Sequence, residues 1–199
     1  MKLVGIYLSP YVRRVAAAMI SRELPYEHEP VNGYREFEVA SRYNPVAKVP
    51  SLVLDDGDIL IDSGAILDYL NELVPSAPLI PAASRARRAT LKLAAIGYSI
   101  CEQAARLSAA RRGHAPESDT KRWRAQVLGG LSALDAVAGE GGPLRAAPLD
   151  AAGITAIVAV ELLALINPDL EILPSIPRLA DFAAQHRETP PFAQTRPTL

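Results

Sequence analysis

Short apolar runs alternate with polar stretches through the first third of the chain. Residues 2–8 (KLVGIYL) are rich in β-branched and aromatic side chains, which predicts a strand. Ser9 can cap a helix that has Pro10 at its first position, and apolar residues recur at helical spacing as far as Met19. A second run at 26–31 predicts another strand, so the chain opens in the order β-α-β.

The next segment carries a hairpin pattern. Residues 51–54 and 59–61 are apolar and flank an Asp-Gly pair, which favours a tight turn between two strands. A weak helical pattern precedes the hairpin at 35–43, and a stronger one follows from Asp62-Ser63 to Leu73. The predicted order of the whole segment is therefore β-α-β-α-β-β-α.

The rest of the chain is helical in its pattern. Residues 74–84 contain three prolines and several small residues, which is typical of a linker. Four helical stretches follow, at 85–112, 119–138, 150–166 and 177–187. We therefore expect an α/β domain over 1–76, a linker over 77–84 and an all-helical domain over 85–199.

Composition narrows the classes of partner. The chain has 199 residues, of which 49% are hydrophobic, and this is enough to build a sizeable core. The net charge of −1 gives no field to hold nucleic acid or anionic lipid, so we expect neither as a partner. The longest apolar stretch, 154–166, contains Thr155 and Glu161 and is too short to span a membrane.

Cysteine and histidine usage points to a cytoplasmic protein without a metal. Cys101 is the only cysteine, so an intramolecular disulfide and a cysteine-rich metal site are both excluded. A reducing, cytoplasmic location fits this usage. The histidines, His28, His114 and His186, are scattered without the spacing of zinc ligands, and we expect no metal site.

Three short motifs could carry chemistry. The Ser9 hydroxyl lies at a helix start, where backbone N–H groups and the helix dipole favour a thiolate, although it could also serve as a cap alone. Pro50, before the hairpin, would turn the Val49 backbone toward an extended peptide if it were cis, or would be a simple edge proline. Asp62-Ser63 combines a carboxylate with an anion-binding helix start, which suits a zwitterionic γ-glutamyl group, and both residues can also cap the helix.

Together, the element order and these motifs resemble the glutathione S-transferase family, in particular its bacterial, serine-type members. Residues 44–70, NPVAKVPSLVLDDGDILIDSGAILDYL, form the most specific part of the likeness. The helical second half resembles the family's second domain, so the likeness covers essentially the whole chain. It implies a thioredoxin-like βαβαββα domain followed by an all-helical domain, glutathione as co-substrate and a homodimer.

The resemblance also implies a set of site residues. Ser9 would hydrogen-bond the glutathione sulfur, Val49 would pair its backbone with the cysteinyl unit, and Pro50 would be cis. Asp62 and Ser63 would hold the γ-glutamyl group. Lys48, and less directly Arg35, would reach the glycyl carboxylate.

Two alternatives concern the thiolate. Tyr7 lies where tyrosine-type members keep a thiolate-stabilising phenol, although a packed strand aromatic would occupy the same position. Ser9-Pro10-Tyr11-Val12 resembles the Cys-Pro-Tyr-Cys of glutaredoxins with both cysteines replaced. Because no thiolate of the protein is present there, mixed-disulfide chemistry is not expected.

The expected function is a glutathione transferase that activates the thiolate toward a small electrophilic substrate in detoxification. The alternative is a non-catalytic glutathione-binding or scaffold protein of the same fold. One departure concerns the buried helix of the second half. The family often begins this helix with a Ser/Thr-x-x-Asp capping box, whereas this chain has Asp150 and Gly153 at those positions.

Overall fold

The computed structural model describes residues 1–113, 115–139, 142–144 and 148–198. The chain forms two compact units. One unit comprises Met1–Ile80 together with Glu188–Leu199, and the other comprises Pro81–Arg187.

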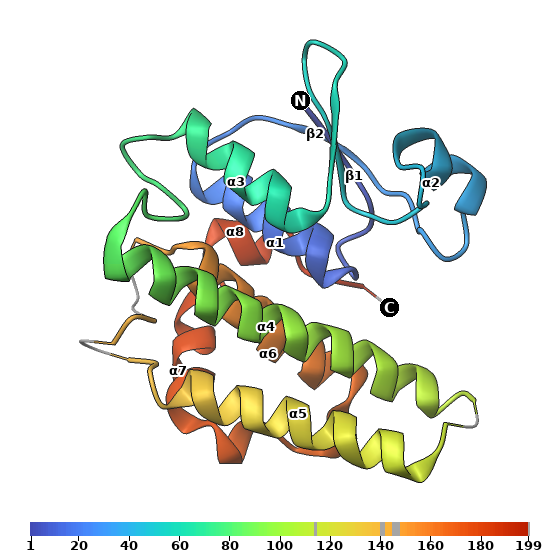
Figure 1. Cartoon of the computed structure of the whole chain (residues 1–199), viewed down its shortest axis with the longest axis vertical. Helices are drawn as coiled ribbons and strands as arrows, with labels where there is room; N and C mark the ends of the chain where they lie inside the picture. The colour runs from blue at the N-terminus through green and yellow to red at the C-terminus, as the bar shows by residue number, and fades with distance from the viewer. Residues whose placement is uncertain (114, 140–141, 145–147, 199) are drawn as a thin grey trace. The chain divides into compact units, whose positions relative to one another are not determined.

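The first unit contains a four-stranded mixed sheet. Its strands are β1 (Lys2–Val4), β2 (Glu27–Glu29), β3 (Ser51–Val53) and β4 (Ile59–Ile61), arranged in the order β2-β1-β3-β4. β1 is parallel to β2 and antiparallel to β3, which in turn is antiparallel to β4. This is the expected thioredoxin-like sheet, and it is drawn near the top of Figure 1.

Helices complete the unit around this sheet. α1 (Pro10–Ser21) and α3 (Ser63–Leu73) pack against each other and run side by side in Figure 1. α2 (Phe37–Tyr43) stands apart from that pair. The buried Val4 of β1 packs with Ala40 of α2, whereas Leu3, which points to the opposite face by strand alternation, is fully buried there. The sheet therefore has an apolar core on each face.

The first strand is shorter than the sequence predicted. β1 ends at Val4 because Gly5 takes a φ of +134°, outside the extended region. Gly5 and Ile6 still donate backbone hydrogen bonds toward the β2 side, to Glu29 O and Val31 O. The chain then turns, and Ser9 N donates to Ile6 O over 3.0 Å. This turn delivers the chain to the start of α1.

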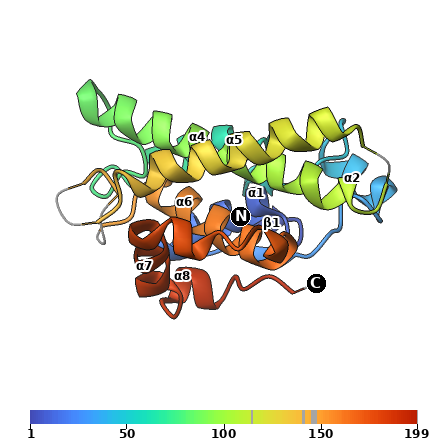
Figure 2. The same cartoon turned by 90° about the horizontal axis from the view of Figure 1, so that it is seen from below.

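The second unit is helical, as expected. Its long helices α4 (Ser84–Ala110) and α5 (Glu117–Asp135) run alongside each other in both Figures 1 and 2. α6 (Ala151–Ile166) packs on α4 and is buried along most of its length, and α7 (Pro177–His186) packs on α6. Two 3-10 turns, Pro168–Leu170 and Leu173–Ser175, join α6 to α7.

The end of the chain departs from the expected division. Residues 188–198, which the sequence pattern placed with the helical domain, lie with the first unit and include α8 (Pro190–Ala193). The physical reason is Arg13 of α1, whose buried guanidinium donates to Thr195 O over 2.9 Å and to Phe192 O over 3.5 Å. The Phe192 ring is fully buried and lies 5.9 Å from the guanidinium carbon.

Candidate functional site

Ser9 occupies the N-cap of α1, as the sequence predicted. Its Oγ accepts a hydrogen bond from Val12 N over 3.5 Å, and Pro10 fills the first helical position. The side chain is partly exposed, and no acidic residue lies in the first turn of α1. The helix start thus presents a hydroxyl and backbone amides with positive partial charge, an arrangement that stabilises an anion.

The Val49–Pro50 peptide bond is cis, as predicted. Asn44 organises the loop that leads to it: its Nδ2 donates to Lys48 O over 2.8 Å, and its Oδ1 accepts from Val46 N over 3.0 Å. Asn44 is 3% exposed, so these bonds are shielded from water. Sequence reasoning did not single out Asn44, although a polar residue beside Pro45 in a turn was a usable sign.

Gly5 brings the Ser9 and Val49 segments together. A Cβ added at Gly5 would lie 2.4 Å from Val12 Cγ2 and 2.9 Å from Val49 Cβ, both shorter than any normal contact. The backbone at Gly5 therefore touches the first turn of α1 on one side and the cis-proline loop on the other. Its φ of +134° is a second reason for glycine at this position.

Asp62 and Ser63 begin α3. Asp62 Oδ1 accepts from Gly64 N over 2.7 Å and from Ala65 N over 3.3 Å, which makes Asp62 the N-cap. Its backbone has φ +70° and ψ +126°, a conformation that non-glycine residues seldom adopt. Such strain is often found in residues that shape a binding site.

Arg14 links α1 to this helix start. Its Nε donates to Ser63 Oγ over 2.9 Å, and both side chains are buried, at 5% and 1% exposure. A hydroxyl that accepts one hydrogen bond keeps its own hydrogen for another acceptor. The guanidinium also adds a positive charge beneath the positive end of the α3 dipole, which favours a carboxylate there.

Arg14 was not predicted as a site residue from the sequence. An arginine on an amphipathic helix normally points to solvent, and nothing in its own position marks it as buried. The usable sign was its neighbourhood. Arg13 and Arg14 both lie between Val12 and Val15, inside the apolar stripe of α1.

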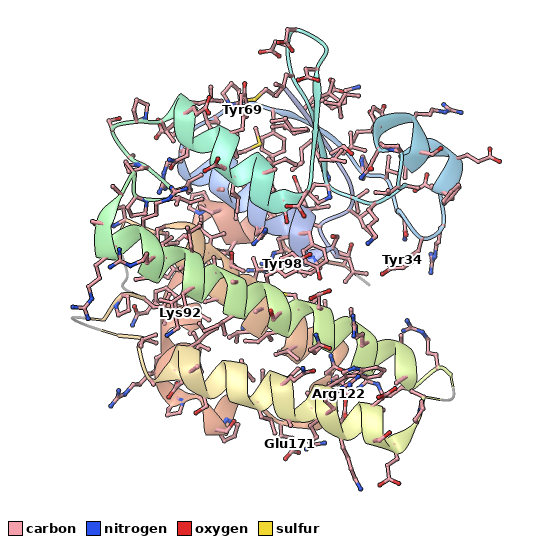
Figure 3. The ribbon with its side chains drawn as sticks, in the orientation of Figure 1. Tyr34, Tyr69, Lys92, Tyr98, Arg122 and Glu171 are labelled. Carbon is pink, nitrogen blue, oxygen red and sulfur yellow. The ribbon has the colours of Figure 1, made fainter. Side chains whose placement is uncertain are left out.

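Lys48 and Arg35, the two candidates for the glycyl carboxylate, are both exposed. Lys48 lies directly before Val49 in the loop that Asn44 holds. Arg35 lies in the turn before α2, where its backbone N donates to Asn32 O over 3.0 Å. The neighbouring Tyr34 is 98% exposed and projects from the same turn (Figure 3).

Tyr7 takes part in a different set of contacts. Its hydroxyl lies 3.0 Å from the Tyr26 hydroxyl, and its ring stacks on His28 with centroids 4.1 Å apart. Burial raises the pKa of Tyr26, and the hydrogen bond with Tyr7 raises it further. The Tyr7 phenol is thus already engaged by another side chain, whereas the Ser9 hydroxyl bonds only its own helix turn in the described contacts.

Among the described residues, no group of three or more His, Cys, Asp and Glu side chains could hold a metal ion. His114 lies outside the described residues. Cys101 is buried in α4. None of the helices in the described part of the chain has the length and apolar character needed to cross a membrane.

Comparison with known proteins agrees with this fold. Residues 3–78 match the family described as "Glutathione S-transferase, N-terminal domain". A curated relative, maleylacetoacetate isomerase of Pseudomonas aeruginosa, is 30% identical over 99% of this chain and 96% of its own length. The class defined by the fold is that of a thioredoxin-like domain combined with a helical domain.

Solved structures give the same result over the full length. A glutathione transferase family member of Pseudomonas fluorescens Pf-5 with bound glutathione has a TM-score of 0.85 and 29% identity, covering 100% of this chain and 99% of that one. A maleyl pyruvate isomerase, described as a bacterial glutathione S-transferase of the zeta class, has a TM-score of 0.80 and 25% identity over 98% and 96% of the two chains. The chain belongs to the glutathione S-transferase family.

Proposed function

We propose that this protein is a glutathione transferase, an enzyme that binds glutathione in its first unit and activates the thiol for attack on a small electrophile. The observation that carries the proposal is the meeting of three segments on the first turns of α1. Ser9 caps that helix, the Val49 segment adjoins it through Gly5, and Ser63 is bonded to it by Arg14. The family membership and the glutathione-bound structure of a relative support the same ligand.

Each part of glutathione has a suitable partner in this proposal. The γ-glutamyl carboxylate is accepted at the start of α3 by Ser63, with Arg14 behind it, and its ammonium group by the exposed carboxylate of Asp62. The cysteinyl backbone pairs with the Val49 backbone as an added strand would. The exposed Lys48 is the first candidate for the glycyl carboxylate, and Arg35 is the second.

The chemical step depends on the state of the sulfur. A cysteine thiol has an ordinary pKa of about 8.5, so most glutathione is protonated at neutral pH. The N-terminus of α1 and a hydrogen bond from Ser9 stabilise the thiolate, and the released proton passes to solvent. A pKa lowered by one to two units corresponds to about 1.4–2.7 kcal/mol. The thiolate then attacks the electrophilic carbon and forms the carbon–sulfur bond; on an aryl halide the carbon–halogen bond breaks and the halide leaves as an anion to solvent.

The test compares two variants in the conjugation of glutathione to an aryl halide. Ser9→Ala should lower kcat/KM by about tenfold or more, since one pKa unit corresponds to a tenfold change. Tyr7→Phe should change it little, because the Tyr7 hydroxyl is paired with Tyr26. Equal rates for Ser9→Ala and wild type would remove Ser9 from the mechanism, and a loss confined to Tyr7→Phe would assign the role to Tyr7.

A second candidate activity is glutathione-dependent cis–trans isomerisation of a maleyl-type substrate. It is favoured by the full-length relative that carries the name maleylacetoacetate isomerase. In such a reaction the thiolate adds to the double bond and leaves again after rotation, so glutathione is not consumed. Turnover of maleylacetoacetate at constant thiol concentration would support isomerisation, whereas loss of thiol with turnover would support conjugation.

The alternative of a non-catalytic glutathione-binding protein gives a different pattern. It predicts retention on immobilised glutathione without conjugation, isomerisation or peroxidase activity. Failure to bind glutathione in calorimetry would contradict both readings. Within this proposal the protein works in detoxification as a cytoplasmic homodimer. Sedimentation tests the dimer, and cell fractionation tests the location.

A further inference from the structure

Tyr7 lies within the turn of residues 5–9 that leads to Ser9, and it contacts two aromatic side chains of the β2 segment, Tyr26 and His28. We call Tyr7, Tyr26 and His28 the aromatic cluster. The rings of Tyr7 and His28 are stacked nearly parallel, with 6° between their planes, and the Tyr7 and Tyr26 hydroxyls are 3.0 Å apart. All three side chains are partly buried.

His28 makes a second contact with the same turn. Its Nε2 lies 2.7 Å from Gly5 O. A carbonyl oxygen can only accept, so Nε2 carries the hydrogen of this bond. One side chain therefore holds the turn at two points, at the Gly5 carbonyl by a hydrogen bond and at Tyr7 by stacking. Leu3 is the register partner of His28, so the two residues lie side by side on adjacent strands.

The other side of Gly5 is packed tightly. There is no room for a Cβ between Gly5 and either Val12 of α1 or Val49. The Gly5 backbone is thus held between α1 and the cis-proline loop on one side and His28 on the other. Any shift of Gly5 would be passed on to the start of α1, because Ser9 N is bonded to Ile6 O within the same turn.

We propose that His28 is a positioning residue for Ser9, and that Tyr7 belongs to this support and not to the thiolate-stabilising group. This inference rests on the proposed function, in which Ser9 bonds the glutathione sulfur. A hydrogen bond weakens steeply once distance and angle leave their narrow range, so a small displacement of the turn is enough to weaken the Ser9–sulfur bond. Glutathione binding itself depends mainly on other segments, those of Val49 and Ser63.

The experiment measures the thiol pKa of bound glutathione from the ultraviolet absorbance of its thiolate as a function of pH. His28→Ala should raise that pKa by about one unit, a tenfold loss of thiolate below the pKa. The dissociation constant of glutathione, measured about one pH unit below the thiol pKa of the wild-type complex, should stay within about twofold of wild type, because glutathione then binds mainly as the thiol and the loss falls on the thiolate alone. If His28 had a purely structural role, His28→Ala would lower stability but would not raise the thiol pKa while leaving the dissociation constant of glutathione unchanged.

Two further variants keep the test decisive. His28→Phe keeps a ring to stack on Tyr7 but removes the bond to Gly5 O, so the thiol pKa should rise by less than in His28→Ala. If His28→Ala does not fold, His28→Phe tests whether His28 positions Ser9. Glu27→Gln, at an exposed position beside His28 on β2, is the matched control and should behave as wild type.

The outcomes separate this inference from the proposed function. A wild-type thiol pKa in the folded His28 variants, combined with a raised pKa in Ser9→Ala, would overturn the positioning role alone. A wild-type thiol pKa in Ser9→Ala would instead contradict the role of Ser9 in the proposed function. For Tyr7, the expected result is a similar small effect of Tyr7→Phe and Tyr26→Phe. A much larger effect of Tyr7→Phe would show that its hydroxyl acts on the sulfur directly.

Discussion

Two adjacent arginines of α1 are buried and hold different parts of the first unit. Arg13 bonds the end of the chain, and Arg14 bonds the start of α3. A buried guanidinium is costly unless its N–H groups are satisfied, and each of these side chains has partners. The pair therefore shows how one turn of helix connects segments that are far apart in sequence.

We predict that Arg14→Met weakens glutathione binding. The change removes the donor to Ser63 Oγ and the positive charge beneath the start of α3, and it should raise the KM for glutathione by about tenfold, or about 1.4 kcal/mol. The KM is obtained from the initial rate measured as a function of glutathione concentration at a saturating concentration of the electrophile. Arg88→Met, at an exposed position of α4, is the matched control. An unchanged KM in Arg14→Met would contradict a role for Arg14 in the γ-glutamyl site.

Ala47 has a backbone conformation that the sequence did not predict. It has a φ of +50° in the loop before Val49 and is 6% exposed. An L-residue with a Cβ loses about 1 kcal/mol in this region, whereas glycine does not. Ala47→Gly should therefore raise the free energy of unfolding by about 0.5 kcal/mol after the greater chain entropy of glycine is subtracted.

Urea unfolding measures this change. Ala40→Gly, inside α2, gives the opposite sign because glycine in a helix interior costs about 1 kcal/mol relative to alanine. If Ala47→Gly and Ala40→Gly lowered the free energy of unfolding by the same amount, the positive φ at Ala47 would not destabilise the wild-type protein.

His186 makes the free energy of unfolding depend on pH. It is 8% exposed in α7 and packs edge-on against Phe182, and burial lowers the pKa of its imidazole. The unfolded chain therefore takes up a proton at higher pH than the folded one, and stability falls as the pH drops below the ordinary pKa of histidine. His186→Gln should lose less stability than wild type between about pH 7.5 and pH 5.5. Parallel losses in the two proteins, measured by urea unfolding, would contradict this.

At the scale of elements, α6 begins with an unusual cap. Asp150 Oδ1 accepts from Gly153 N over 2.9 Å, and its Oδ2 accepts from Thr90 Oγ1 of α4 over 2.7 Å. A Cβ at Gly153 would lie 2.9 Å from Leu149 Cδ2, so the acidic residue of a capping box would have to displace that side chain. A hydroxyl from the neighbouring helix thus occupies the second oxygen of the cap and ties α4 to α6.

We predict that Thr90→Val lowers the free energy of unfolding by about 1–2 kcal/mol, because it leaves a partly buried carboxylate oxygen without its donor. Thr120→Val is the control, since the Thr120 hydroxyl bonds only a carbonyl of its own helix, α5. A double-mutant cycle with Asp150→Ala measures the coupling directly. Additive effects of the two changes would mean that the bond contributes nothing.

The sequence was informative where local chemistry decides the structure. Ser9 and Asp62 could be assigned as helix caps because capping depends on residues within one turn, and the Asp-Gly turn of the hairpin contains Gly57 with a φ of +91°. Thr90 could not be paired with Asp150, nor Arg14 with Ser63, because both pairs join helices through tertiary packing. The burial of Arg14 was not predicted, because an arginine on an amphipathic helix normally points to solvent.

At the scale of the whole molecule, the first unit is built from two separate stretches of chain. Residues 1–80 supply the sheet and its helices, and residues 188–198 return to α1. Phe192 contributes a fully buried ring to this contact, and the Arg13 guanidinium satisfies two backbone carbonyls at the end of the chain. The glutathione-binding unit is therefore incomplete without its C-terminal stretch.

We predict that Arg13→Met lowers the free energy of unfolding by about 2 kcal/mol, the usual cost of losing buried hydrogen bonds to a charged group. Amide hydrogen exchange should become faster in residues 190–195 and remain slow in α6. Arg178→Met, on the exposed side of α7, is the matched control. Unchanged exchange at 190–195 would show that Arg13 does not hold the chain end.

The return of residues 188–198 to α1 has a consequence for synthesis on the ribosome. The segment that completes the first unit is translated only after the 107 residues of Pro81–Arg187, a delay on the order of ten seconds. During that time the nascent first unit lacks the contacts of Phe192 and Thr195 with Arg13. The first unit, whose residues 1–80 are translated early, is thus completed only after residues 188–198 have been translated.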